Sequence, residues 1–103
     1  MGKLKMYILV KDSVPVGKAI VSVAHASLGA YLKWQDDPDM QRWANSIFFK
    51  VVCKVSEADF EDAKKLPEGL VITESTLDNQ EVAVAFKPRE EWPVQFKLYQ
   101  LYR

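Results

Sequence analysis

The sequence predicts an α/β fold, namely a three-layer α/β/α sandwich around a small four-stranded mixed sheet. Segments of strand length alternate with helical segments along most of the chain, which implies crossover connections and parallel pairing. A short link joins the last two predicted strands, so we expect that pair to be antiparallel. The length of 103 residues leaves room for one domain, and we assign residues 1–103 to it.

The first predicted strand spans residues 4–10. Its even-numbered residues are apolar and take one face, while Tyr7 and Leu9 cover much of the other. Apolar residues on both faces are typical of a strand that lies between two layers. After a loop at residues 11–15, a helical pattern rich in alanine, leucine and isoleucine predicts a long helix over residues 16–34.

The remaining elements are expected as a short helix over residues 39–45, a strand over 47–55, a helix from the cap Ser56 to Pro67, and strands over 69–73 and 81–87. Asp78 and Asn79 mark the turn between the last two strands. The tail, residues 89–103, is ambiguous. Pro93 opposes a helix there, whereas the aromatic side chains of the tail suggest packing.

Composition narrows the function classes. Fourteen basic residues balance fourteen acidic ones, which argues against a basic nucleic-acid arm and an acidic tail but leaves room for a local basic patch. With one cysteine, Cys53, and one histidine, the chain lacks an internal disulfide and a Cys/His metal site. The apolar run at residues 6–10 is too short for a signal peptide core or a membrane span. We therefore expect a cytoplasmic protein without a metal.

The long helix carries the most information. Helical geometry gathers one apolar face, expected to pack on the sheet, and this face consists of Val16, Ile20, Val23, Ser27, Tyr31 and Trp34, flanked by Val21, Leu28 and Leu32. A narrow stripe of Lys18, Ser22, His25 and Gly29 is left over. It is either a plain solvent face or a functional one.

Two details favour a functional stripe. A lysine in the first helical turn opposes the macrodipole, and small residues around the histidine leave a floor that a ligand can approach. A lysine at a helix N-terminus adds its charge to the free backbone N–H groups there, and together these suit a phosphate or a carboxylate.

The segment from Val16-Gly17-Lys18-Ala19 to Ala24-His25-Ala26-Ser27-Leu28-Gly29-Ala30-Tyr31 resembles the first-helix signature of the class II (archaeal and eukaryotic type) peptidyl-tRNA hydrolases. The resemblance continues with Trp43, the strand from Lys50 to Val55, and Ala85-Phe86-Lys87-Pro88, in the same order as in the family. It covers most of the chain.

The resemblance implies a fold of the peptidyl-tRNA hydrolase II kind and hydrolysis of the ester between a peptide and the 3′ ribose of tRNA, with no metal or cofactor. Lys18 and His25 carry over as catalytic candidates, and Glu74 and Thr76 are the nearest counterparts of the family's aspartate and threonine. Ser22 replaces a family glutamine, and Val23 replaces a small residue or cysteine. The segment at residues 74–80 is shorter than in the family.

Two functions follow from these observations. The first is a peptidyl-tRNA hydrolase-like enzyme with Lys18, Ser22, Lys33 and Lys87 on its substrate-binding surface. A lysine cluster of Lys11, Lys18, Lys33 and Lys87 with Arg89 would then hold the tRNA. The alternative is a catalytically inactive relative that binds tRNA or protein. A third class, an interaction domain that uses the aromatic tail (Trp92, Phe96, Tyr99 and Tyr102) for a partner or a homodimer, is weaker, because such aromatics more often pack in a core.

Overall fold

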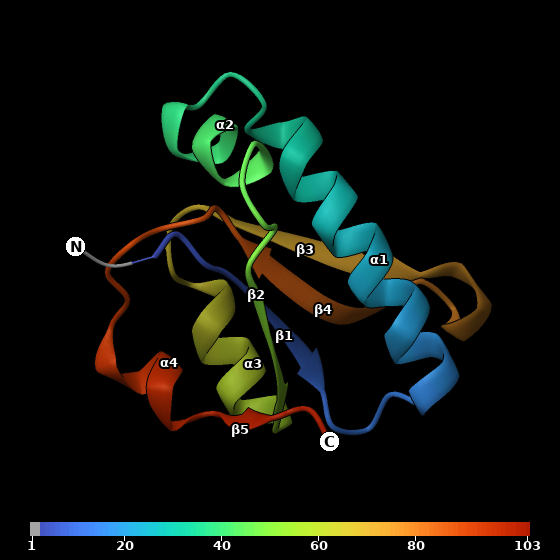
Figure 1. Ribbon diagram of the computed structural model, residues 1–103. Helices are drawn as coiled ribbons and strands as arrows, with labels where there is room; N and C mark the ends of the chain where they lie inside the picture. Colours follow the sequence, from blue (N-terminus) through green and yellow to red (C-terminus); the bar gives the residue numbers. More distant parts are fainter. Residues whose placement is uncertain (1–2) are drawn as a thin grey trace.

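The computed structural model describes residues 3–103. Its elements follow in the order β1 (Met6–Lys11), α1 (Val16–Lys33), α2 (Pro38–Ala44), β2 (Lys50–Val55), α3 (Glu57–Lys64), β3 (Gly69–Glu74), the 3₁₀ turn η1 (Ser75–Leu77), β4 (Gln80–Phe86), α4 (Val94–Leu98) and β5 (Gln100–Leu101). Figure 1 shows one mixed sheet with helices on both of its faces.

The sheet has five strands in the order β3-β4-β1-β2-β5. β1 pairs with β2 in parallel, and β4 pairs with both β1 and β3 in antiparallel fashion. The three strands that helical crossovers connect, β1, β2 and β3, therefore run in one direction, as expected. However, β4 lies between β1 and β3 in the sheet. The expectation of four strands was wrong, because Gln100 and Leu101 form a short fifth strand on β2.

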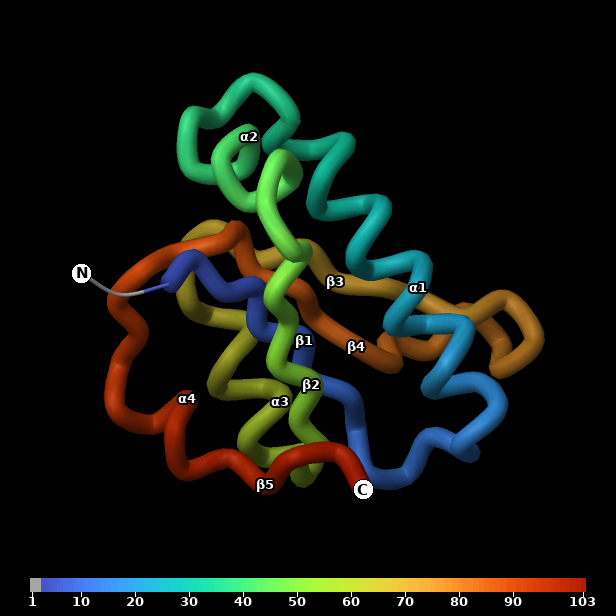
Figure 2. The backbone as a smooth tube through the Cα atoms, in the orientation of Figure 1, coloured from blue at the N-terminus to red at the C-terminus, as the bar shows by residue number. Residues whose placement is uncertain are grey.

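Residues of β1 alternate between two cores, which explains the three layers. Met6, Ile8 and Val10 face the core under α1 and α2, whereas Tyr7 and Leu9 face the core under α3 and α4. The tube in Figure 2 follows the same arrangement, with α1 and α2 on one side of the strands and α3 and α4 on the other. The predicted sandwich is confirmed in its layers.

The sequence pattern predicted a strand from residue 47, but β2 begins at Lys50. Phe48 has a φ of 57°, in the left-handed region, which an extended strand does not tolerate. Ile47 and Phe48 are both exposed, at 72% and 54%. Apolar content alone was therefore a poor guide to the start of this strand.

The aromatic tail belongs to the protein's own core. The ring centroids of Trp92 and Phe96 lie 4.8 and 5.1 Å from that of Tyr7, and both side chains are buried. Pro93 precedes α4 and is compatible with its start. These aromatics are thus occupied by intramolecular packing. Cys53 is fully buried nearby, and burial raises the pKa of its thiol to about 11, as expected of a small core residue.

Helix α1 faces the sheet with its small residues, which corrects the predicted orientation. Ala19, Ser22, Ala26 and Ala30 are its buried residues, whereas Ile20 and Leu28 are 67% and 61% exposed. Small side chains allow a helix to approach a sheet closely, and a Cβ on Gly29 would lie 2.9 Å from Cδ2 of Leu70. Counting bulky apolar residues therefore selected the wrong face. None of the helices among residues 3–103 is long and apolar enough to cross a membrane.

Candidate functional site

The close approach of α1 to β3 positions the site. Side chains alternate along a strand, so Leu70, Ile72 and Glu74 point to the same face. Gly29 of α1 lies over Leu70 and Ile72. The end of β3 therefore carries Glu74 toward the part of α1 that contains Lys18 and His25, whose charges act on it.

Glu74 is the best-anchored group of the site. Its Oε2 accepts hydrogen bonds from the backbone nitrogen of Thr76, at 3.0 Å, and from Oγ1 of the same residue, at 2.8 Å. The side chain is 8% exposed. The hydrogen bonds from Thr76 lower the pKa of Glu74, and the nearby charges of Lys18 and His25 lower it further against the effect of burial. Glu74 is thus held as a carboxylate beside both candidates.

A tight hairpin supplies Glu74 and Thr76 despite the short segment at residues 74–80. Asp78 and Asn79 adopt left-handed backbones with φ of 56° and 59°, and the backbone nitrogen of Asn79 donates to the carbonyl of Glu74 at 3.0 Å. Asparagine and aspartate tolerate this region better than other residues with a Cβ. The predicted turn is confirmed, and it closes the loop immediately beyond Thr76.

Lys18 lies in the first turn of α1 and is half-buried. Pro15 at the N-cap provides no side-chain hydrogen bond, and the first turn contains no acidic residue. Within residues 3–103, Lys18 forms no ion pair. Its charge therefore adds to the positive end of the helix without a direct carboxylate partner.

His25 and Ser22, which the sequence placed on one stripe, lie in different surroundings. His25 is exposed on the flank of α1. Ser22 is fully buried, and its Oγ donates to the carbonyl of Lys18 at 2.7 Å. Substrate contact by Ser22 stays a prediction, and its burial and the hydrogen bond within its own helix argue against it.

The predicted lysine cluster does not form. Lys87 Nζ lies 2.8 Å from Asp37 and 3.1 Å from Glu68, and its hydrogen bond to Asp37 is the main reason that its pKa is raised. Asp37 follows the C-terminal end of α1, and the 15 steps from Lys18 to Lys33 span about 22 Å along that helix. Substrate binding by Lys87 stays a prediction, and its two carboxylate partners argue against it. Lys11 pairs with Glu57 at 3.3 Å, and Arg89 lies over the ring of Trp92.

Lys33 lies at the C-terminal end of α1, over the start of β3. Its Nζ is 3.4 Å from the carbonyl oxygen of Gly69 and 4.9 Å from the ring centroid of Trp34. Of the four predicted substrate-binding residues, Lys18 and Lys33 thus keep exposed or half-exposed cationic groups on one helix.

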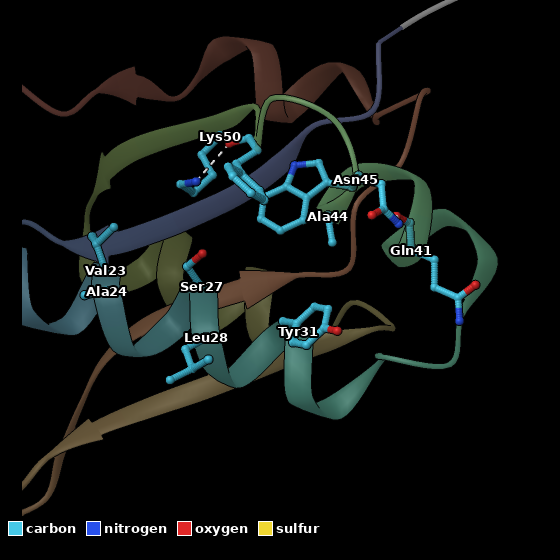
Figure 3. A pocket seen from close by; sticks show the side chains of 11 residues that line it. Val23, Ala24, Ser27, Leu28, Tyr31, Gln41, Ala44, Asn45 and Lys50 are labelled. Carbon is cyan, nitrogen blue, oxygen red and sulfur yellow. Dashed lines mark hydrogen bonds between the residues drawn. The ribbon is translucent and has the colours of Figure 1, made fainter.

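Sequence reasoning missed a groove of about 690 Å³ on the other flank of α1. Val23, Ser27 and Tyr31 line one side of it, and residues of α2 and the start of β2 line the other. Figure 3 shows Tyr31 and Lys50 on opposite walls of this groove. The groove was missed because these α1 residues had been assigned to the sheet contact.

Among residues 3–103, no three metal-ligating side chains of histidine, cysteine, aspartate or glutamate converge. The site offers the imidazole of His25, the ammonium group of Lys18 and the fixed carboxylate of Glu74 for chemistry. Such a set supports proton transfer and stabilises a developing oxyanion.

Comparison with known families places this geometry in context. A family model described as peptidyl-tRNA hydrolase PTH2 matches residues 4–95. Lys18, His25, Glu74 and Thr76 all fall inside the matched region, whereas β5 lies beyond it. Among curated proteins, none matches the chain.

Proposed function

The chain belongs to the peptidyl-tRNA hydrolase PTH2 family, and we propose that it hydrolyses the ester between a peptide and the 3′ ribose of tRNA. The observation that supports this activity most is the fixed carboxylate of Glu74, which is close enough to Lys18 and His25 for their charges to lower its pKa. A base, a cation and a carboxylate thus come together from α1 and β3, which is the set of groups that hydrolysis of an ester needs.

In the proposed reaction, His25 accepts a proton from a water molecule as the water oxygen attacks the ester carbonyl carbon. Lys18 stabilises the oxyanion of the tetrahedral intermediate. When the intermediate collapses, the bond to the ribose 3′ oxygen breaks, and that oxygen takes the proton from His25. The products are a free peptide carboxylic acid and a tRNA with its 3′ hydroxyl restored.

Glu74 acts on His25 in this scheme. A carboxylate near the imidazole stabilises the positive charge that develops on the ring as the attacking water gives up its proton. Thr76 keeps the carboxylate ionised and oriented through two hydrogen bonds. Thr76 is therefore a positioning residue, and its contribution depends on Glu74.

The tRNA part of the substrate would meet the cationic side of α1, where Lys18 and Lys33 lie, and the reaction would take place in the cytoplasm, where peptidyl-tRNA forms. Each phosphate contact releases counterions, so the logarithm of the affinity should fall linearly with the logarithm of the salt concentration. Few lysines are available, so we expect a shallow slope, which titration of labelled tRNA at several salt concentrations measures.

Release of N-acetylaminoacyl groups from tRNA by the purified protein tests the activity. Wild-type protein should hydrolyse the ester above the uncatalysed rate, and His25→Ala should lower kcat/KM by roughly 100- to 1,000-fold. Lys97→Ala, an exposed change on the opposite layer, should behave as wild type. Equal rates for wild type, His25→Ala and the blank would overturn the proposed enzyme.

The alternative function, an inactive relative that binds protein, is supported by a different observation. Ile20, Leu28 and Leu32 expose 67%, 61% and 55% of their surfaces on the outer side of α1, and exposed apolar patches often mark interaction sites. A second copy of the chain is the occupant to test first. Sedimentation should then show a dimer that Leu28→Glu converts to a monomer. A monomeric wild type at all concentrations would remove the homodimer.

A further inference from the structure

β3 forms an edge of the sheet next to the candidate site. The strand order ends at β3, whose hydrogen-bonded neighbour among residues 3–103 is β4. β3 contains neither lysine nor proline, the residues that most often protect a strand edge from pairing. Four of its six residues are half-buried and Thr73 is exposed, so the edge is accessible from outside.

Alternation of hydrogen bonding tells which backbone groups face outward. The backbone nitrogen of Lys87 donates to the carbonyl of Glu68 at 3.0 Å, so this pair is hydrogen-bonded. Counting along the register, Leu70 and Ile72 also direct their backbone groups to β4. Gly69, Val71 and Thr73 therefore direct theirs to the open edge, and the bond from Lys33 Nζ to the Gly69 carbonyl agrees with this.

The register shift near the end of β3 does not disturb this alternation. Ile72 lies opposite Ala83 and Thr73 opposite Glu81, so the extra residue, Val82, belongs to β4. Glu74 then directs its carbonyl inward, where it accepts the hydrogen bond from Asn79. Lys33 occupies the outward carbonyl of Gly69, so the part of the open edge next to Glu74 consists of the backbone groups of Val71 and Thr73.

The direction of β3 matters for what binds there. β3 runs toward Glu74, so a strand added in parallel brings its own C-terminal end to the same place. On α1, His25 projects about 100° from the buried Ala26. This is the flank that carries Gly29 above Leu70. The added strand would therefore end between His25 and Glu74.

We propose that the peptide part of the substrate binds as a sixth strand, parallel to β3 and hydrogen-bonded to the open backbone groups of Val71 and Thr73. Its C-terminal ester then lies at Lys18, His25 and Glu74. The inference rests on the proposed hydrolase activity. Peptides on tRNA vary in sequence, and recognition through main-chain hydrogen bonds serves all of them, since it needs no particular side chain.

Lys33 sets the length of the added strand. Its Nζ donates a hydrogen bond to the carbonyl of Gly69 and so blocks the edge at that residue. The remaining open edge is long enough to pair with about four residues of a peptide. With N-acetylated peptides on tRNA, kcat/KM should rise from one to about four residues and then stay level. One net hydrogen bond corresponds to roughly two- to tenfold in affinity.

Val71→Pro tests the edge directly, because it removes an outward N–H while sparing the bonds of Leu70 and Ile72 to β4. Val71→Ala is the matched control, since it shortens the side chain but keeps the N–H. Val71→Pro should lose roughly two- to tenfold in kcat/KM for tetrapeptidyl-tRNA relative to Val71→Ala, so that its kcat/KM rises less with peptide length. Equal length dependence in both variants would overturn the proposal.

A second measurement uses the wild-type protein and does not depend on how the variants fold. Amide hydrogen exchange at Val71 and Thr73 should slow when a tetrapeptide joined by an amide to 3′-amino-adenosine is added. Unchanged exchange at both residues contradicts the sixth strand.

A wild-type dimer that Val71→Pro dissociates and Val71→Ala does not would also contradict it, because the edge would then bind a second copy of the chain. Absence of any hydrolysis, even of N-acetylaminoacyl-tRNA, overturns the proposed function instead, and the exchange result then decides the edge separately.

Discussion

A lysine lies near a carboxylate at each end of helix α1, and the two lysines differ in whether they form an ion pair. Beyond the C-terminal end, Lys87 lies 2.8 Å from Asp37 and 3.1 Å from Glu68 and is 12% exposed. At the N-terminal end, the carboxylate of Glu74 is held by Thr76 and not by Lys18. One lysine is neutralised by its neighbours, and the other keeps its charge for a ligand.

This difference shows what a neutral partner achieves. A hydroxyl and a backbone N–H hold the carboxylate of Glu74 without using a cation, so the charge of Lys18 has no ion-pair partner among residues 3–103. At the Lys87 end, the ion pair joins the start of α2 to the end of β4 and holds the layers together. The first arrangement suits binding an anionic transition state, and the second suits stability.

Exchanging each lysine for methionine separates the two roles. Lys18→Met should lower kcat/KM for N-acetylaminoacyl-tRNA roughly 100-fold, because the oxyanion loses its cation, with little change in the free energy of unfolding. Lys87→Met should do the reverse, losing about 1–3 kcal/mol of stability while kcat/KM stays near wild type. Steady-state kinetics and urea unfolding measure both. A similar loss of activity in the two variants would erase the distinction between the ends.

Thr76→Val removes the hydroxyl that holds Glu74 and keeps the side-chain volume. The carboxylate loses its 2.8 Å hydrogen bond but keeps the one from the backbone, so we expect roughly a tenfold fall in kcat/KM. Thr76→Ser retains the hydroxyl and should stay close to wild type. If the serine variant falls as far as the valine variant, packing and not hydrogen bonding explains the effect.

Asp37→Ala tests the structural end. Asp37 caps α2 by accepting hydrogen bonds from the backbone nitrogens of Asp39 and Met40, at 2.9 and 3.2 Å. Losing the cap should cost about 1 kcal/mol in the free energy of unfolding, and the variant also loses the 2.8 Å ion pair with Lys87. Asp36→Ala, an exposed neighbour, is the control. Chemical unfolding of both variants gives the values, and equal stability would show that neither the cap nor the ion pair stabilises this end of the helix.

The smallest expected effect is on acid stability. The pKa of Glu74 lies below its ordinary 4.5 in the folded protein, so its contribution to stability is present above that pH and is lost as the pH falls further. Glu74→Gln should therefore flatten the stability profile between neutral and acid pH relative to wild type. Unfolding midpoints of wild type and Glu74→Gln, measured across this pH range, show whether the profile flattens. A steeper profile in the variant would mean that the carboxylate is not stabilised by folding.

The sequence predicted the layers, the turn at Asp78 and Asn79, and the cap at Ser56, whose Oγ accepts from the backbone nitrogen of Asp59 at 3.1 Å. These features depend on local patterns. The buried face of α1 was predicted wrongly because the small residues Ala19, Ala26 and Ala30 pack where bulky ones were expected. Close helix–sheet approach is a tertiary effect, which apolar content along one helix does not reveal.

For the site, the family resemblance identified the residue types, and the fold decides which of them meet. Lys18, His25 and Glu74 come together because Gly29 lets α1 lie directly on β3. Ser22 and Lys87 were equally plausible by sequence, yet one is buried and the other is paired with two acids. Burial and ion pairing depend on residues distant in sequence, so they were not predictable from the stripe alone.

A double-mutant cycle tests most directly whether His25 and Glu74 act as one site. The kinetics of hydrolysis are measured for His25→Ala, Glu74→Gln and the double variant on the same N-acetylaminoacyl-tRNA. If Glu74 acts through His25, the double variant should lose no more activity than His25→Ala alone. Losses that simply multiply would contradict a shared site and would leave Glu74 a structural residue of the hairpin.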